Sequence, residues 1–202
     1  MTIRRYLSEQ AAHPHGLAGR LLAWNWLRET AAVNDIAVDL LHARPGERIC
    51  EIGFGPGQTL GRIAAVGAHV LGVDIAADML MVAGRRNAAA VAAGQIELVE
   101  GDGTALPTAD ATLDAALSVH SLYFWPDQPA VLAELRRVLR PGGRLVVALR
   151  PADQPLPARL DPAVYHVPTV AELARLLRTA GFAAVHAERR PHLPAIVWMT
   201  AT

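Results

Sequence analysis

The sequence predicts an α/β fold in which helices cover the faces of a mostly parallel sheet, and two observations carry this prediction. From Arg48 onward, short apolar runs alternate with stretches of helical periodicity, an order that is typical of parallel sheets. The first run, residues 49–52, leads through Gly53, Gly55 and Gly57 into a helical pattern at residues 60–66. A strand, a tight glycine turn and a helix in this order present backbone N–H groups to an anionic ligand.

The composition fits one folded domain. The 202 residues are 52% hydrophobic and 19% charged, and 19 basic residues balance 19 acidic ones. This balance argues against nucleic acid or an anionic membrane surface as a partner. No apolar run approaches the length of a membrane span and no leader pattern opens the chain, so we expect a cytoplasmic protein. The eight histidines lack the spacing of metal ligands, and the single Cys50 is expected to be a buried, inert thiol.

The N-terminal segment, residues 1–44, is predicted to form a helical lid on a core that spans residues 45–202. Its pattern is helical except at His13-Pro14-His15-Gly16, where proline and glycine break it. Trp24 and Trp26 lie among leucines in this segment. We expect them to pack against the domain as part of the lid.

The alternating core continues through four more strands. Strands are predicted at residues 69–74 and 96–100, with a helix near residues 78–92 between them. A fourth strand at 113–118 precedes a helix at 128–139, whose apolar residues recur at helical spacing. Pro141-Gly142-Gly143 is expected to end that helix and to turn the chain into a fifth strand at 144–149.

The C-terminal segment has a different character. Five prolines between residues 151 and 168 exclude a long helix and predict an ordered loop or lid. Thr169 with Glu172 forms a capping box, which predicts a helix that ends at Gly181. Apolar runs at 183–188 and 195–199 predict an antiparallel pair of strands at a sheet edge.

Two acids indicate which ligand the glycine turn holds. Asp74 closes the second strand about twenty residues beyond the turn, where a carboxylate can accept hydrogen bonds from both hydroxyls of a ribose. This feature alone does not separate S-adenosylmethionine from NAD. Glu51 separates them, because a carboxylate just before the first glycine repels a pyrophosphate but can hold the amino group of a methionine moiety. The turn is also Gly-x-Gly-x-Gly, whereas the dinucleotide fingerprint is Gly-x-Gly-x-x-Gly.

A second acidic turn follows the third strand. There Asp102 can accept from the exocyclic amine of adenine, while Gly103 offers its backbone N–H. With Glu51, Asp74 and the turn at residues 141–143, these features make the chain resemble the class I S-adenosylmethionine-dependent methyltransferases, specifically the small-molecule group that includes the ubiquinone and menaquinone biosynthesis enzymes. The resemblance covers residues 45–149.

The resemblance implies a Rossmann-like sheet of seven strands in the order 3-2-1-4-5-7-6, with strand seven antiparallel. It also implies S-adenosylmethionine as cofactor and in-line transfer of its methyl group to a small-molecule acceptor, with the O, N or C atom left open. No metal is implied, and a monomer or homodimer is expected. The expected cofactor-binding residues are Glu51, Gly53, Gly55, Gly57, Asp74, Ile75, Met79, Asp102, Gly103 and Ser118.

The acceptor is expected beyond the fourth strand, since open parallel sheets bind ligands at the carboxyl ends of their strands. His120 is the candidate general base, because a near-neutral imidazole can take a proton at working pH, although a local hydrogen-bonding role is the alternative. Tyr123 is a second catalytic candidate. It can form, with Phe124 and Trp125, an apolar wall for the acceptor, or it can pack in the core. Tyr165 and His166 in the proline-rich loop are further candidates.

Two other functions stay open at this point. An NAD(P)-dependent oxidoreductase is the first alternative, against which Glu51 and the glycine spacing argue. The second is a non-catalytic S-adenosylmethionine-binding protein that serves a partner, although none of its cofactor motifs is broken.

Overall fold

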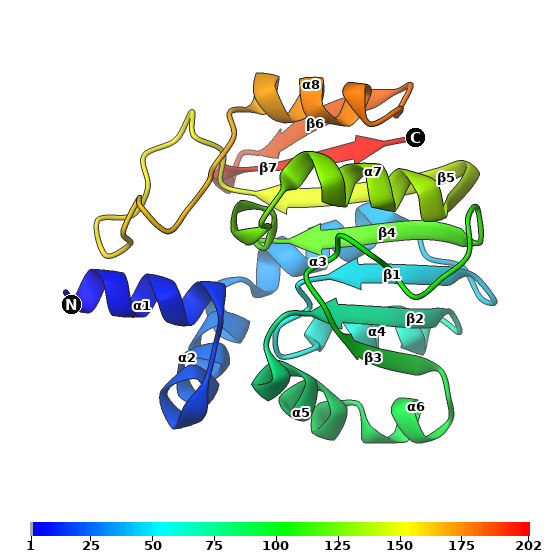
Figure 1. The fold of residues 1–202 in the computed structure, drawn as a ribbon, viewed down its shortest axis with the longest axis horizontal. Helices are drawn as coiled ribbons and strands as arrows, with labels where there is room; N and C mark the ends of the chain where they lie inside the picture. The colour runs from blue at the N-terminus through cyan, green and yellow to red at the C-terminus, as the bar shows by residue number, and fades with distance from the viewer. Residues whose placement is uncertain (1) are drawn as a thin grey trace.

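The protein is built around one seven-stranded sheet with the order β3-β2-β1-β4-β5-β7-β6 (Figure 1). A computed structural model describes residues 2–202, apart from the side chain of Trp24, so the lid prediction for that side chain lies outside the described residues. The strands are β1 (Arg48–Ile52), β2 (His69–Asp74), β3 (Ile96–Glu100), β4 (Leu113–Val119), β5 (Leu139–Leu149), β6 (Val185–Arg190) and β7 (Leu193–Ala201). β7 runs antiparallel to both β5 and β6, while β1 to β5 pair in parallel. The expected fold, including its sheet order, is confirmed.

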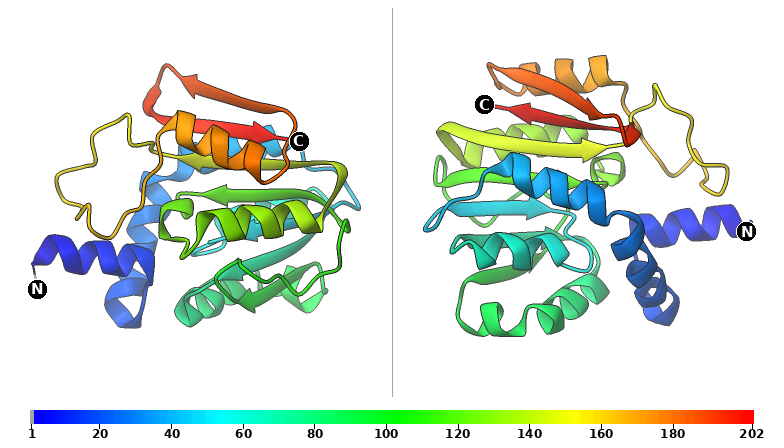
Figure 2. Two further views of the ribbon diagram at one scale, coloured as in Figure 1. Left: turned by 45° about the horizontal axis from the view of Figure 1, so that its top comes forward. Right: turned by 180° about the vertical axis from the view of Figure 1, so that it is seen from behind.

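Helices pack on both faces of this sheet and bury a separate apolar core on each (Figure 2). One core gathers apolar side chains of α3 (Ala31–Leu41), α4 (Gln58–Ala65) and α5 (Ala77–Arg86). The opposite core gathers those of α7 (Gln128–Val138) and α8 (Val170–Thr179). Trp198 in β7 is fully buried, and its indole Nε1 donates to the Val33 carbonyl at 3.2 Å, which ties α3 to the sheet. Cys50 is also fully buried, and burial raises the pKa of its thiol.

Two predicted elements differ in detail from the structure. The helix expected at residues 78–92 is broken at Asn87 into α5 and α6 (Ala88–Ala92). Asn87 has a non-helical ψ of 27°, and its side-chain amide donates to the Gly57 carbonyl at 2.9 Å, so it ties the helix to the glycine turn instead of extending it.

The turn at residues 141–143 lies inside a strand and does not precede one. β5 begins at Leu139, whose backbone is already extended and pairs with Leu113. The pairing with β4 then shifts register between Leu113 and Ala115, and Gly142 takes a φ of 76° within that irregularity. The turn therefore forms an interruption in the strand pairing.

The helix and the antiparallel pair of strands predicted for the C-terminal segment are present, with bounds that differ by a few residues. In the capping box, the Glu172 backbone N–H donates to Thr169 Oγ1 at 3.1 Å and the Thr169 backbone N–H donates to the Glu172 carboxylate at 2.7 Å. β6 and β7 pair in antiparallel fashion, with β6 at the sheet edge. The proline-rich loop, residues 151–168, contains no helix or strand.

The N-terminal segment forms α1 (Ile3–Ala12), α2 (Gly16–Glu29) and α3, with the predicted break after Ala12. α1 and α2 lie beyond the carboxyl ends of the parallel strands, on the same side of the molecule as the proline-rich loop (Figures 1 and 2). Three contacts join these helices to that loop. Arg4 donates to the Leu160 carbonyl at 2.8 Å, Arg159 pairs with Glu29 at 2.8 Å, and the Asp161 N–H donates to Ser8 Oγ at 2.8 Å.

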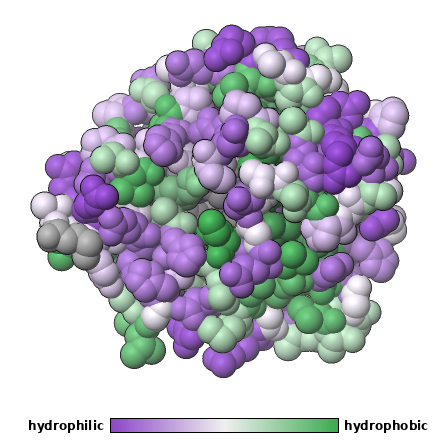
Figure 3. Space-filling model, viewed as in Figure 1, coloured by the Kyte–Doolittle hydropathy of each residue, from purple (hydrophilic) through white to green (hydrophobic). Residues whose placement is uncertain are grey.

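Polar and apolar residues are intermixed on the face drawn in Figure 3, which agrees with the balanced charge of the chain. Among residues 2–202, the longest apolar helical stretch falls short of what is needed to cross a membrane.

Candidate active site

The glycine turn has a backbone shape that only glycine adopts readily. Gly53, Gly55 and Gly57 have φ values of 74°, 52° and 74°, in the left-handed region. A Cβ on Gly53 would lie 2.2 Å from the Cβ of Ser121, and one on Gly57 would lie 2.6 Å from the Cβ of Ala83. The turn therefore packs closely against the segment after β4 on one side and against α5 on the other.

Glu51 is a buried carboxylate at the end of β1. It is 2% exposed and accepts a hydrogen bond of 2.6 Å from the Thr59 hydroxyl. Burial, opposed by the Thr59 hydrogen bond and assisted by the negative charge of the nearby Asp74, raises the pKa of Glu51 to about 8. A ligand ammonium group beside this carboxylate would stabilise its charged form, as expected for the methionine end of the cofactor.

Asp74 and Asp102 are held differently. The Asp74 carboxylate accepts from the backbone N–H groups of Gly55 at 2.8 Å and Ala76 at 3.0 Å, one on each oxygen, while burial raises its pKa. Asp102 accepts from the hydroxyl and the N–H of Thr104, at 2.6 and 2.9 Å, both on Oδ1, and these bonds lower its pKa. Each carboxylate keeps lone pairs for hydroxyl or amine donors of a nucleoside. The residues present thus fit S-adenosylmethionine.

One cavity of about 680 Å³ joins these acids to the segment after β4. This volume lies in the range of small-molecule and cofactor sites. The predicted site residues that line it are Glu51, Gly53, Gly55, Asp74, Ile75, Met79, Asp102, His120 and Tyr123. Their direct contact with a cofactor or substrate stays a prediction.

Three predicted cofactor residues, Gly57, Gly103 and Ser118, lie behind the cavity wall. Gly57 is the N-cap residue of α4 and packs against Ala83 of α5. A Cβ on Gly103 would lie 3.1 Å from a methyl group of Ile52, and Ser118 is fully buried with its hydroxyl 2.7 Å from that of Ser121. In this structure they support the residues that line the cavity.

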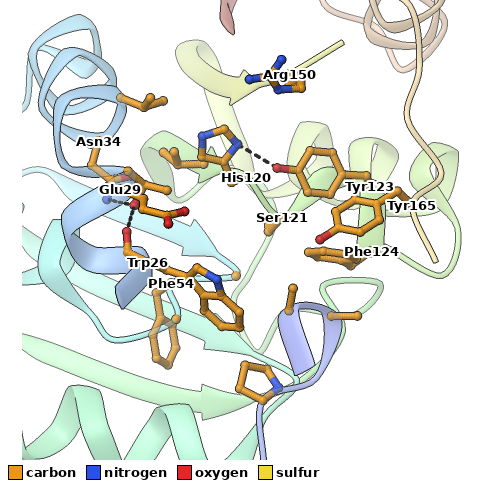
Figure 4. Close-up of a pocket in the computed structure, with 18 of the residues that line it drawn as sticks. Trp26, Glu29, Asn34, Phe54, His120, Ser121, Tyr123, Phe124, Arg150 and Tyr165 are labelled. Atoms are coloured by element: carbon orange, nitrogen blue, oxygen red, sulfur yellow. Dashed lines mark hydrogen bonds between the residues drawn. The ribbon is translucent and has the colours of Figure 1, made fainter. Parts of the chain in front are cut away.

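His120 and Tyr123 form a hydrogen-bonded pair at the carboxyl end of β4 (Figure 4). The distance between His120 Nδ1 and the Tyr123 hydroxyl is 2.7 Å. Burial, together with the positive charge of Arg150, lowers the pKa of His120 to about 4, so the imidazole is neutral at pH 7. His120 also has a φ of 56°, which is rare for a bulky side chain and typical of residues that a functional site holds in place.

Aromatic rings line one side of the cavity. Tyr123 and Phe124 meet edge to face with ring centroids 4.9 Å apart, and Tyr165 lies 4.8 Å from Phe124 and 5.3 Å from Tyr123. Figure 4 shows Trp26 and Phe54 on the opposite side. The backbone N–H of His166 donates to the Tyr123 carbonyl at 3.0 Å, which holds the adjacent Tyr165 at the cavity. The side chain of His166 itself is exposed and does not line the cavity.

Sequence reasoning did not single out two residues of this site. Ser121 lines the cavity, and its hydroxyl donates to the Ile52 carbonyl at 2.8 Å, a contact across 69 residues for which the sequence holds no signal. Arg150 lines the cavity directly after β5. The rule that ligands bind at the carboxyl ends of parallel strands could have found it.

Trp125 lines the cavity and is 5% exposed, and it also packs in the apolar core that contains α7. Within residues 2–202, nothing accepts a hydrogen bond from its buried indole Nε1. Such a donor is costly to bury alone, so a bound ligand atom that accepts from it would be stabilised.

Known proteins match this chain in sequence. The family described as a methyltransferase domain matches residues 50–147. The uncharacterized methyltransferase YdaC of Bacillus subtilis is 30% identical over 141 residues, which are 68% of this chain and 72% of that protein. A demethylmenaquinone methyltransferase of Corynebacterium kroppenstedtii is 38% identical over 107 residues, 53% of this chain and 43% of the relative. The chain thus spans about half the length of several curated relatives that it matches, from 32% to 60% for four of them.

Solved structures share the fold at low sequence identity. A Thermotoga maritima protein described as a SAM-dependent methyltransferase, possible histamine N-methyltransferase, superposes with a TM-score of 0.70 at 23% identity and covers 92% of this chain and 95% of its own. The sheet order, the acids around the cavity and these matches together show that the chain belongs to the class I S-adenosylmethionine-dependent methyltransferases.

Proposed function

We propose that this protein transfers the methyl group of S-adenosylmethionine to a small, largely apolar acceptor. The observation that carries the proposal is that one cavity holds both the acids suited to the cofactor and an aromatic chamber beside them. Bound S-adenosylmethionine supplies an activated methyl group on a sulfonium. The protein's contribution is to hold an acceptor in line with it, and such positioning can be worth about 7 to 11 kcal/mol.

Each acid has a separate role in this proposal. Glu51 binds the amino group of the methionine moiety, Asp74 binds the ribose hydroxyls, and Asp102 accepts from the adenine amine. Asp74 is preorganised for this role, because the N–H groups of Gly55 and Ala76 fix both of its oxygens. The aromatic wall and α2 exclude water from the acceptor.

His120 is the proposed general base for an acceptor that must lose a proton. With the hydrogen on Nδ1 and donated to the Tyr123 oxygen, the Nε2 lone pair is free to take that proton. The low pKa of His120 keeps this lone pair available across the physiological range. Tyr123 orients the ring and is itself a poor acid, because burial raises its pKa well above the usual value.

The test is calorimetric binding of S-adenosylhomocysteine and NADH to the purified protein, followed by chromatography for S-adenosylhomocysteine formed from S-adenosylmethionine and a panel of small acceptors. We expect S-adenosylhomocysteine to bind, NADH not to bind, and turnover to depend on the acceptor. Binding of NADH without S-adenosylhomocysteine overturns the proposal. Binding of S-adenosylmethionine without turnover on any acceptor, together with a stable partner protein, favours the non-catalytic alternative.

A further inference from the structure

Arg150 differs from Arg159, the other arginine that lines the cavity, in its hydrogen-bond partners. Two arginines line the cavity, Arg150 and Arg159. The guanidinium of Arg159 pairs with the Glu29 carboxylate at 2.8 Å. The Arg150 side chain, within residues 2–202, makes one hydrogen bond, from Nη1 to the Pro155 carbonyl at 3.3 Å, and no ion pair with a carboxylate. A half-buried guanidinium has five donors, so most of its capacity is free for a ligand.

The position of Arg150 is next to the proposed reaction centre. The parallel pairing of β4 with β5 brings the ends of the two strands together, and the His120 N–H donates to the Ala148 carbonyl at 2.8 Å. Arg150 follows two residues after Ala148, and Figure 4 shows it above the pair formed by His120 and Tyr123. The positive charge of Arg150 acts to lower the pKa of both His120 and Tyr123.

The space around Arg150 is apolar and extends away from the cofactor acids. A second cavity of about 280 Å³ shares Arg150, Leu156, Tyr165 and Val167 with the main one. The rings of Tyr123, Phe124 and Tyr165 contact one another and form an aromatic side of the main cavity. Such a wall suits a flat, apolar ligand body, because aromatic rings pack on one another in offset or edge-to-face contacts.

We propose that Arg150 is the binding site for a carboxylate on an otherwise flat and apolar methyl acceptor, whose nucleophilic group then lies at His120. The inference rests on the proposed function and names its acceptor class. A guanidinium matches a carboxylate with two parallel hydrogen bonds, and one such cation balances one negative charge. A phosphate monoester carries about −1.5 to −2 charges, which a single guanidinium does not balance.

The test compares two probes that differ only in this group, 1-hydroxy-2-naphthoate and 1-hydroxy-2-naphthamide. Each is titrated calorimetrically into the protein saturated with S-adenosylhomocysteine. We expect the acid to bind about 10- to 100-fold more tightly than the amide, as is usual for a charge-assisted hydrogen bond. Arg150→Met should remove the preference and Arg150→Lys should keep part of it. Arg85→Met removes an exposed arginine outside the cavity and should leave the preference intact.

The outcomes are distinct. Equal binding of acid and amide to the unmodified protein, absence of acid binding, or a preference that survives in Arg150→Met overturns the inference. The first comparison uses the unmodified protein, so it stands even where a variant fails to fold. Failure of S-adenosylhomocysteine to bind contradicts the proposed function instead, which separates the two.

Discussion

Replacing Gly53 by alanine should cost more stability than any other glycine substitution with the same backbone strain. Gly53 has a φ of 74°, and a non-glycine residue in that region loses roughly 1 to 2 kcal/mol. The added Cβ would also lie 2.2 Å from the Cβ and 2.5 Å from the Oγ of Ser121. Relief of such overpacking costs about 1 to 3 kcal/mol, so the expected loss for Gly53→Ala is about 2 to 5 kcal/mol.

A matched control separates the two causes. Gly46 has a φ of 80°, but a Cβ there would meet nothing within 4 Å, and Gly46 is outside the cavity lining. Gly46→Ala should therefore lose only the conformational part, about 1 to 2 kcal/mol. Urea unfolding followed by circular dichroism measures both variants.

The clash should also appear as coupling with Ser121. In a Ser121→Gly background the added methyl group has room, so Gly53→Ala should cost about 1 to 3 kcal/mol less there than in the unmodified protein. Calorimetry should show weaker S-adenosylhomocysteine binding for Gly53→Ala, because a shifted Ser121 displaces the neighbouring His120 and Ile52 contacts. A Gly53→Ala variant as stable as Gly46→Ala, with no coupling to Ser121, would refute the reasoning.

The remaining predictions concern the titratable groups of the cavity. Asp74→Asn should weaken S-adenosylhomocysteine binding about tenfold or more in calorimetry, whereas Asp110→Asn, which changes an exposed carboxylate, should leave it unchanged. An affinity of Asp74→Asn equal to that of the unmodified protein contradicts the ribose role. Because the pKa of Glu51 is raised to about 8, its carboxyl is mostly protonated at pH 7, and an ammonium group bound there drives off the proton. Binding enthalpies should therefore vary with the buffer's ionisation enthalpy, and Glu51→Gln should abolish this variation; buffer-independent enthalpies in the unmodified protein argue against it. The pKa of His120 is lowered to about 4, so kcat should not change with pH from about pH 5 to about pH 8, and a kcat that titrates near the ordinary 6.5 contradicts this. His120→Asn should lower kcat and leave the affinity for the cofactor unchanged.

The order of the elements was predictable because each is marked by local features of the chain. Apolar runs, the glycine turn and the capping box at Thr169 act over a few residues, so they can be found without knowing the fold. The predicted bounds of the elements were wrong where a contact with a residue distant in the sequence overrides the local pattern. Asn87 breaks a helix because its amide reaches the Gly57 carbonyl, and the turn at residues 141–143 is absorbed into β5 by pairing with β4.

The sequence by itself determined the cofactor class, because Glu51, Asp74 and Asp102 each lie at or just beyond the carboxyl end of a strand, and these ends meet at one edge of a parallel sheet. Only the tertiary structure decided what surrounds them. Arg150 joins His120 through the pairing of β4 with β5, and Tyr165 joins Tyr123 through a backbone hydrogen bond across more than forty residues. The side of the cavity that we propose for the acceptor is assembled by such long-range contacts, which depend on packing and leave no local pattern in the chain.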